Sequence, residues 1–283
     1  MPGAFRKGLA AALTWLGVIL ALPAHGAAAP GDELVLGVFP HMPATRLLEV
    51  FTPIGDDFSR ALGRPVKVRT RPDFAQFVAE LQAETYDIAF IQPLDYVWLH
   101  DRHGYLPLAR RDAPLKSVIV VNSDSRIKTL EDLKGGSLAQ AAPRAAVTQI
   151  VAAALKAEGF DLDKDIRRSY STNHFACIQK VLTGEADACG TAARALAHWT
   201  EINPEQAFRI IYEAPVMPHA LFVVHPRVPE DQRRRLLETI LSWPQTGAGR
   251  EILSRGELLP FTRATDADYN PVRRFDFETP NPE

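Results

Sequence analysis

The chain has 283 residues, of which 46% are hydrophobic and 23% charged, and its formal net charge is −2 at pH 7. Acidic and basic residues are well mixed along it, which argues against a nucleic-acid-binding surface. About 255 residues remain after the N-terminal segment considered next, enough for two compact lobes.

The N-terminal segment has the order of a secretory signal. Arg6 and Lys7 precede an apolar run from about Leu9 to Leu22, and small residues follow at 24–29. This order predicts a signal peptide over residues 1–26, cleaved near residues 24–29, and hence a periplasmic protein. The run is shorter than the ~20 residues of a membrane-spanning helix, and a retained anchor is the alternative.

The next part of the chain alternates between strand and helix patterns. Apolar runs and helical spacing predict strand 33–39, helix 44–62, strand 66–70, helix 73–83 and strand 88–91. This order predicts right-handed crossovers and a parallel sheet with helices on its faces. Ligands on such sheets bind beyond the carboxyl ends of the strands, here the loops 39–43 and 92–96.

A second α/β unit is predicted over residues 113–209. Its strands are expected at 117–121, 137–140 and 186–190, and its helices at 128–135, 144–158 and 172–183. Asn173 is a suitable N-cap for the last of these helices. After this unit we expect strands at 209–212 and 220–224 and helices at 229–241 and 247–253.

The sequence has two cysteines, Cys177 and Cys189. Export to an oxidising compartment makes a disulfide between them possible. Their spacing alone does not establish the geometry that the bond requires.

Several segments, taken together and in order, resemble one family. They are YDIAFIQPLDYV at 86–97, SDSRIKTLEDLKGGSLA at 123–139 and TNHFACIQKVLTGEADACGT at 172–191, and the segment 229–253 also fits. The chain resembles the phosphate/phosphite/phosphonate periplasmic substrate-binding proteins of ABC transporters. Each short match is weak alone, but their ordered combination covers nearly all of the chain after the signal.

The resemblance implies a type 2 periplasmic binding protein fold, in which two α/β lobes are joined by a two-strand hinge and enclose a ligand cleft. Lobe 1 would be discontinuous, at 30–112 plus 210–283, and lobe 2 would be 113–209. The hinge strands would lie near Arg110–Ala113 and Arg209–Tyr212. The lobes would close on a small molecule and present it to a membrane permease.

The resemblance also places candidate ligand-binding residues in that cleft. The first lobe would contribute Phe39, His41, Gln92, Tyr96 and His219, and the second lobe Arg144, Ala145, Ala146, Thr148, His174 and Thr191. In the family, a Ser/Thr-rich loop at a helix N-terminus holds an oxyanion, since free N–H groups and the helix dipole favour negative charge there.

Two positions depart from the family pattern. The hydroxyl positions of the anion loop have become Ala145, Ala146 and Val147, and Gln92 replaces the usual glycine. Backbone donors survive the first change, and Arg144 or Thr148 could partly compensate for it. The family therefore predicts an oxyanion ligand resembling phosphonate, phosphite or phosphate, without identifying it.

A metal or metalloid ligand is the alternative. Met42 and Met217 each lie beside a histidine in predicted cleft loops, which gives the candidate donor set His41, Met42, His174, Met217 and His219. Thioether and imidazole donors suit copper, zinc or arsenite. Such a protein would deliver its ligand to a sensor kinase or a chaperone system. A disulfide between Cys177 and Cys189 would remove the thiolate that could join this set.

The sequence shows no catalytic motif that would favour an enzyme. It has no Gly-x-Ser-x-Gly elbow, phosphate-binding glycine loop, His-Glu-x-x-His pair or zinc-type cysteine spacing. We therefore expect a monomeric binding protein without a cofactor. Its partners would be a small-molecule ligand and an ABC permease or a sensor kinase at the inner membrane, with no nucleic acid.

Overall fold

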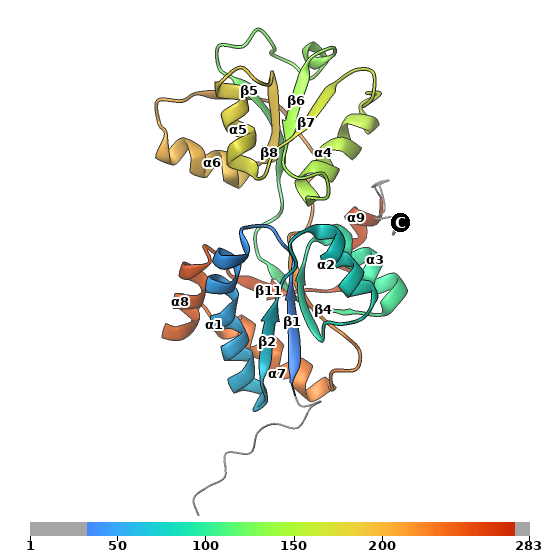
Figure 1. The fold of residues 1–283 in the computed structure, drawn as a ribbon, viewed down its shortest axis with the longest axis vertical. Coiled ribbons are helices and arrows are strands. Elements are labelled where there is room, and N and C mark those ends of the chain that lie inside the picture. The colour runs from blue at the N-terminus through green and yellow to red at the C-terminus, as the bar shows by residue number, and fades with distance from the viewer. Residues whose placement is uncertain (1–32, 275–283) are drawn as a thin grey trace, which may run out of the picture. The chain divides into compact units, whose positions relative to one another are not determined.

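A computed structural model of the chain describes residues 33–274 (Figure 1). The predicted signal sequence lies outside the described residues. Within residues 33–274 the strands form two sheets, one of six strands and one of five. We call the first sheet with its helices the first lobe and the second sheet with its helices the second lobe.

The first sheet has the strand order β11-β4-β10-β3-β1-β2. Its strands are β1 (Leu34–Val38), β2 (Val66–Arg69), β3 (Ile88–Ile91), β4 (Leu106–Arg111), β10 (Leu221–Val224) and β11 (Phe261–Arg263). β1 pairs in parallel with β2 and β3, as predicted, but β10 lies antiparallel between β3 and β4. The sheet is therefore mixed rather than parallel throughout.

The helices of the first lobe surround this sheet. They are α1 (Ala44–Leu62), α2 (Phe74–Gln82), α3 (Pro93–His103), α7 (Glu230–Ser242), α8 (Gly247–Arg255) and α9 (Asn270–Arg273), with a short 3₁₀ turn η2 (Asp266–Tyr269). Helices α1 and α7 pack on the sheet, and α8 packs on α1. In α1 the fully buried side chains recur every three or four residues, as in Leu47, Phe51 and Ile54. α1 ends at Gly63, whose φ of 67° favours glycine.

The second sheet has the strand order β7-β6-β8-β5-β9. Its strands are β5 (Ser117–Asn122), β6 (Ser137–Gln140), β7 (Arg167–Tyr170), β8 (Ala188–Ala192) and β9 (Phe208–Glu213). Its helices are α4 (Ala146–Ala157), α5 (His174–Leu182) and α6 (Ala193–Ile202), and the predicted helix 128–135 is only a 3₁₀ turn, η1 (Glu131–Leu133). The predicted N-cap of α5 is confirmed, since the Asn173 side chain accepts a bond from the Ala176 N–H.

The chain passes between the two sheets twice, through residues 112–116 and 214–220. These two segments pair with each other, because Leu115 and Met217 exchange backbone hydrogen bonds of 2.8 and 3.1 Å. The predicted second crossing, near Arg209–Tyr212, is placed differently. Those residues lie within β9, which pairs with β5 in the second sheet.

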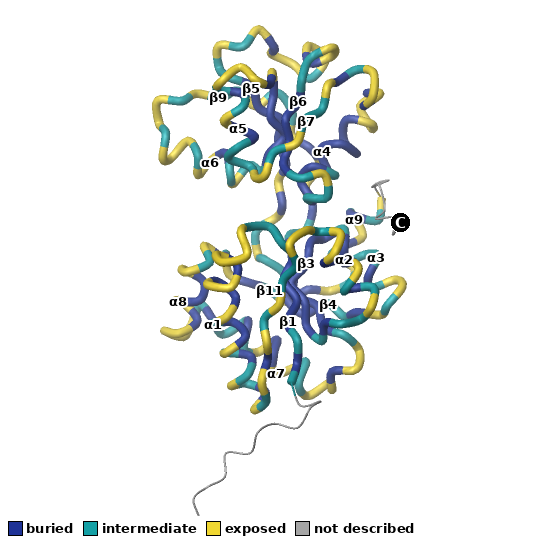
Figure 2. Tube along the Cα trace, in the orientation of Figure 1, coloured by how far each residue is buried: buried dark blue, intermediate teal, exposed yellow. Residues whose placement is uncertain are grey.

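Burial follows the sheets, whose strands are largely dark blue in Figure 2, while exposed residues lie on the helices and loops around them. In the second lobe a disulfide joins Cys177 of α5 to Cys189 of β8, both fully buried. No helix among residues 33–274 has the length and apolar character needed to cross a bilayer.

Candidate functional site

The predicted ligand loops lie at the carboxyl edges of the two sheets. In the first lobe this edge carries Gln92 after β3 and Arg111 at the end of β4, beside the start of β10. In the second lobe it carries the starts of α4, α5 and α6. Both connecting segments run between these same edges, since β4 and β9 end there and β5 and β10 begin there. The connectivity thus gathers the candidate residues at the ends where the lobes are joined.

Gln92 is the best-connected residue of the predicted site. Its side chain is only 5% exposed and makes three hydrogen bonds. Its amide nitrogen donates to the Asp95 carboxylate and to the backbone oxygen of Arg144, both at 3.2 Å. Its amide oxygen accepts a bond of 2.7 Å from the Ala146 N–H, the first residue of α4. Gln92 of the first lobe therefore caps a helix of the second.

This cap has a local cause. The residue before α4 is Ala145, which has no side-chain acceptor, and the helix shows no side-chain cap of its own. The first N–H groups of a helix need acceptors from elsewhere. The amide oxygen of Gln92 supplies one, so a neutral group meets the positive end of the α4 dipole.

Asp95 lies beside this cap, in the first turn of α3, and is 7% exposed. Burial raises the pKa of its carboxyl to about 6, and the amide of Gln92 and the charge of Arg144 oppose that rise. The carboxyl thus titrates in the mildly acidic range rather than near pH 4.

His41 and His219 lie near each other in the first lobe. The Nδ1 atom of His41 is 2.9 Å from the Phe39 carbonyl oxygen, and the two rings stack with centroids 4.3 Å apart. Burial lowers the pKa of His41 to about 4. Burial also lowers that of His219 to about 3, with further contributions from Arg111, Arg194 and His41. Both imidazoles are therefore neutral at pH 7.

His174 and Thr191 form a pair in the second lobe. The Thr191 hydroxyl, fully buried in β8, is 3.1 Å from Nδ1 of His174, the first residue of α5. Burial lowers the pKa of His174 as well. Thr148, in the first turn of α4, is 2% exposed, and its hydroxyl has no hydrogen-bond partner.

Tyr96 takes a different position from the one that the loop prediction suggested. It lies within α3, and its side chain is fully buried. Its hydroxyl donates to Asp266 at 2.9 Å, and its ring lies 4.5 Å from that of Tyr269. Burial and the Asp266 carboxylate raise the pKa of Tyr96. These partners are internal to the first lobe, and contact between Tyr96 and a ligand stays a prediction.

The metal-binding alternative receives no support. Among residues 33–274 no group of three or more His, Cys, Asp or Glu side chains is placed to hold a metal ion. Met217 is 2% exposed and packs in the hydrophobic core, which also contacts Met42, and His174 bonds to Thr191. The disulfide removes the thiolates.

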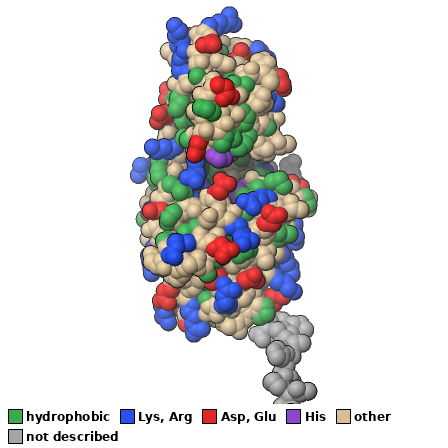
Figure 3. Space-filling model, turned by 90° about the vertical axis from the view of Figure 1, so that its left-hand side faces the viewer, with side chains coloured by type: hydrophobic (Ala, Val, Ile, Leu, Met, Phe, Trp, Pro, Cys, Tyr) green, Lys and Arg blue, Asp and Glu red, His purple; other side chains and the backbone are tan. Residues whose placement is uncertain are grey.

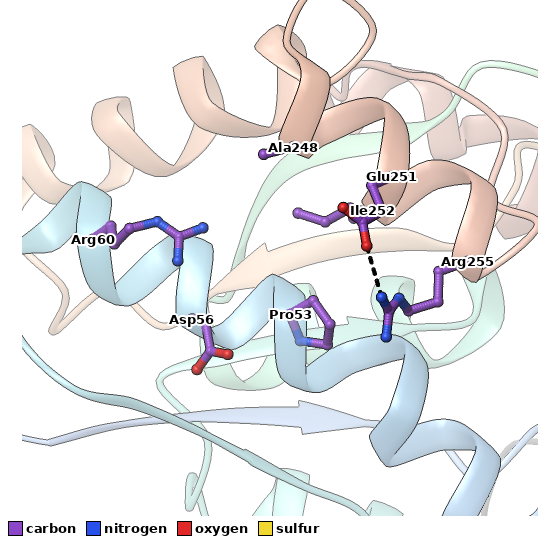
Figure 4. Close-up of a pocket in the computed structure, with 7 residues that line it drawn as sticks. All are labelled: Pro53, Asp56, Arg60, Ala248, Glu251, Ile252 and Arg255. Atoms are coloured by element: carbon purple, nitrogen blue, oxygen red, sulfur yellow. Dashed lines mark hydrogen bonds and ion pairs between the residues drawn. The ribbon is translucent and has the colours of Figure 1, made fainter.

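A groove on the outer surface of the first lobe is a weaker candidate for a ligand-binding site. It lies between α1 and α8 and is lined by Pro53, Asp56, Arg60, Ala248, Glu251, Ile252 and Arg255 (Figure 4). Its charged groups are exposed, and Glu251 pairs with Arg255 at 2.7 Å. None of its lining residues is among the buried polar groups without partners in the described part of the chain.

Sequence reasoning missed two residues at the carboxyl edges. Arg111 ends β4 and was treated only as part of a hinge strand, and Arg194 is the second residue of α6. The available signal was an arginine at the end of a strand, or two residues after one, at the predicted ligand edge. In Figure 3, acidic and basic side chains mix over much of the visible face, and a histidine in a recess has both kinds beside it.

Comparison with known proteins identifies the family. Residues 36–269 match the family described as ABC transporter, phosphonate, periplasmic substrate-binding protein. The chain belongs to this family. Its fold is accordingly the two-lobed α/β fold of periplasmic binding proteins, as predicted.

Individual relatives agree with this assignment. The phosphonates-binding periplasmic protein of Escherichia coli K12 is 22% identical over 268 residues, covering 89% of this chain and 78% of the relative. PhnD1 of Prochlorococcus marinus, solved in complex with methylphosphonate, matches with a TM-score of 0.75 and 18% identity over 86% of this chain and 96% of its own. The binding protein component of an ABC phosphonate transporter from Pseudomonas aeruginosa matches with a TM-score of 0.72 and 19% identity, over 86% of this chain and 85% of its own. These relatives are transport proteins that bind ligands rather than enzymes.

Proposed function

We propose that the chain is exported through its N-terminal signal and acts in the periplasm as a monomer. It captures a small phosphorus oxyanion, such as a phosphonate, phosphite or phosphate, and delivers it to an ABC importer. Family membership supports this role, and so does the placement of the candidate residues at the joined carboxyl edges of the two sheets.

One observation carries the proposal furthest. The hydrogen bond from the Ala146 N–H to Gln92 brings the start of α4 against the loop after β3. These are the two loops where the sequence predicts ligand contacts, one from each lobe. A ligand bound there touches both lobes, and binding energy can then hold them together, as delivery to a permease requires.

The test uses the chain without its first 26 residues. Methylphosphonate, phosphite and phosphate are titrated by calorimetry and by thermal melting, with arsenite, copper and zinc as the competing ligands. A ligand that binds only the folded state raises the melting temperature. A rise with at least one phosphorus oxyanion, and none with the metals or arsenite, supports the proposal. The opposite pattern overturns it.

A further inference from the structure

Arg111 carries a positive charge that no carboxylate of the described residues neutralises. It is the last residue of β4, and its guanidinium lies over the Phe90 ring at 5.6 Å. Its Nε atom is buried without a hydrogen-bond partner, and no carboxylate pairs with it among residues 33–274. The Nε atom of the neighbouring Arg110 also lacks a hydrogen bond, but it lies 3.8 Å from a carboxylate oxygen of Asp268. Arg111 as a whole is half-buried, and a partly buried charge without a carboxylate partner is costly unless a bound ligand pairs with it.

The groups around Arg111 share its sign or are neutral. Its backbone N–H bonds to the carbonyl of Ala220, next to His219, and the His41 ring lies 6.3 Å from the same Phe90 ring. Burial and the charge of Arg194 lower the pKa of Arg111 to about 10. The charge of Arg111 in turn contributes to the lowered pKa values of both histidines. This electrostatic environment favours an anion over a cation.

The two histidines offer different hydrogen-bonding groups. A carbonyl oxygen can only accept, so Nδ1 of His41 must donate to Phe39, and a neutral His41 leaves Nε2 as an acceptor. That Nε2 is buried without a partner. In His219, Nδ1 accepts from the Ala220 N–H at 2.7 Å, so its Nε2 carries the hydrogen and is a donor. The cluster therefore contains one cation, one neutral donor and one unsatisfied acceptor.

We propose that Arg111, His219 and His41 form the anion-binding subsite of the ligand cleft, and that it selects a tetrahedral anion that keeps one hydroxyl. Arg111 and Nε2 of His219 donate to the unprotonated oxygens, and the ligand hydroxyl donates to Nε2 of His41. The singly protonated forms of alkylphosphonates, phosphite and phosphate satisfy all three. A sulfonate or sulfate has no such hydroxyl at neutral pH and would set a lone pair against His41. This inference rests on the proposed function and specifies its ligand chemistry.

The first experiment tests the charge. Calorimetry with methylphosphonate compares the wild type with Arg111→Met, which keeps a long side chain and removes the cation. Affinity should fall by ~30-fold or more, because truncating one side of a buried charge pair has effects of that order. Arg111→Lys keeps the charge without the planar donors and should retain part of the affinity. Arg110→Met is the matched control on the same strand and should bind within twofold of the wild type.

Melting temperatures of the ligand-free proteins separate binding from a structural role. If Arg111 is kept for an anion, Arg111→Met removes an unpaired, half-buried charge, and its melting temperature stays level or rises. A marked fall, with methylphosphonate affinity unchanged, overturns the subsite while leaving the proposed function intact. Failure of the wild type to bind any phosphorus oxyanion overturns both.

The second experiment tests whether the site selects a ligand that carries a hydroxyl group. The wild type should bind methylphosphonate on the order of 100-fold more tightly than methanesulfonate, since one buried acceptor is left unsatisfied by the sulfonate. His41→Asn keeps a donor for the Phe39 carbonyl and removes the Nε2 acceptor, so this ratio should shrink at least tenfold. His198→Asn, on an exposed histidine of α6, is the control. An unchanged ratio in His41→Asn removes His41 from the subsite.

Discussion

The hydrogen bonds that Gln92 makes between the two lobes should contribute measurably to the free energy of unfolding. Gln92→Ala removes three hydrogen bonds, two of which reach the segment that begins α4. Each neutral bond contributes about 1 kcal/mol net, and an N–H left unpaired at Ala146, a buried residue, adds to the loss. The free energy of unfolding should therefore fall by about 2–3 kcal/mol.

Urea denaturation of the ligand-free protein measures this loss. Gln76→Ala is the matched control, because the Gln76 side chain also donates to an aspartate three residues away, at 2.8 Å, but is exposed. Exposed substitutions of this kind change stability by about 0.5 kcal/mol or less. If Gln92→Ala loses no more than Gln76→Ala, the hydrogen bonds of Gln92 do not stabilise the fold, and the reasoning fails.

Two further substitutions should change the stability of the protein, one at a buried carboxyl and one at the disulfide. Because burial raises the folded-state pKa of Asp95 to about 6, well above its ordinary value, its protonated form stabilises the fold, and this contribution is lost as pH rises from about 4 to 6. Asp95→Asn should flatten that fall and raise stability at pH 7 by up to about 3 kcal/mol, and urea midpoints that keep the wild-type pH dependence would contradict the assignment. Replacing Cys177 and Cys189 together by Ser opens a bridge spanning 12 residues and should lower the unfolding free energy by about 3 kcal/mol in calorimetric melting; a loss below 1 kcal/mol would show that the bridge adds little.

The sequence predicted those helices and strands whose apolar side chains recur at a regular helical or strand spacing. α1 was predicted to the residue because its buried side chains recur at helical spacing over five turns and Gly63 ends it. α3 was missed because it starts at Pro93 and carries polar residues along most of its length, with Tyr96 and Leu99 buried by contacts to distant segments. β7 was missed because it is a polar edge strand, defined only by its pairing with β6.

The same limit applies to the candidate site. The sequence predicted which loops gather at the sheet edges, because strand order alone places them there. It did not show that Gln92 meets Ala146, since the two lie 54 residues apart and no periodicity reports such a contact. It also missed Arg111, whose importance depends on what is absent around it: a carboxylate partner, which becomes visible only once the neighbours in space are known.

The two departures from the family pattern are linked through α4. Loss of the hydroxyls at Ala145 and Ala146 leaves the first N–H of the helix without a local acceptor, and Gln92, in place of the usual glycine, supplies one from the other lobe. A donor already bonded to an amide is less available to an anion than a free one, so we expect the positive end of α4 to contribute little to anion binding in this chain. Under the proposed function the charge that an oxyanion needs would then come from side chains, and Arg111 at the facing edge of the first sheet is a half-buried cation without a carboxylate partner among the described residues. If the proposed subsite is right, the main anion contact of this chain is a guanidinium of the first lobe rather than the helix donors of the second.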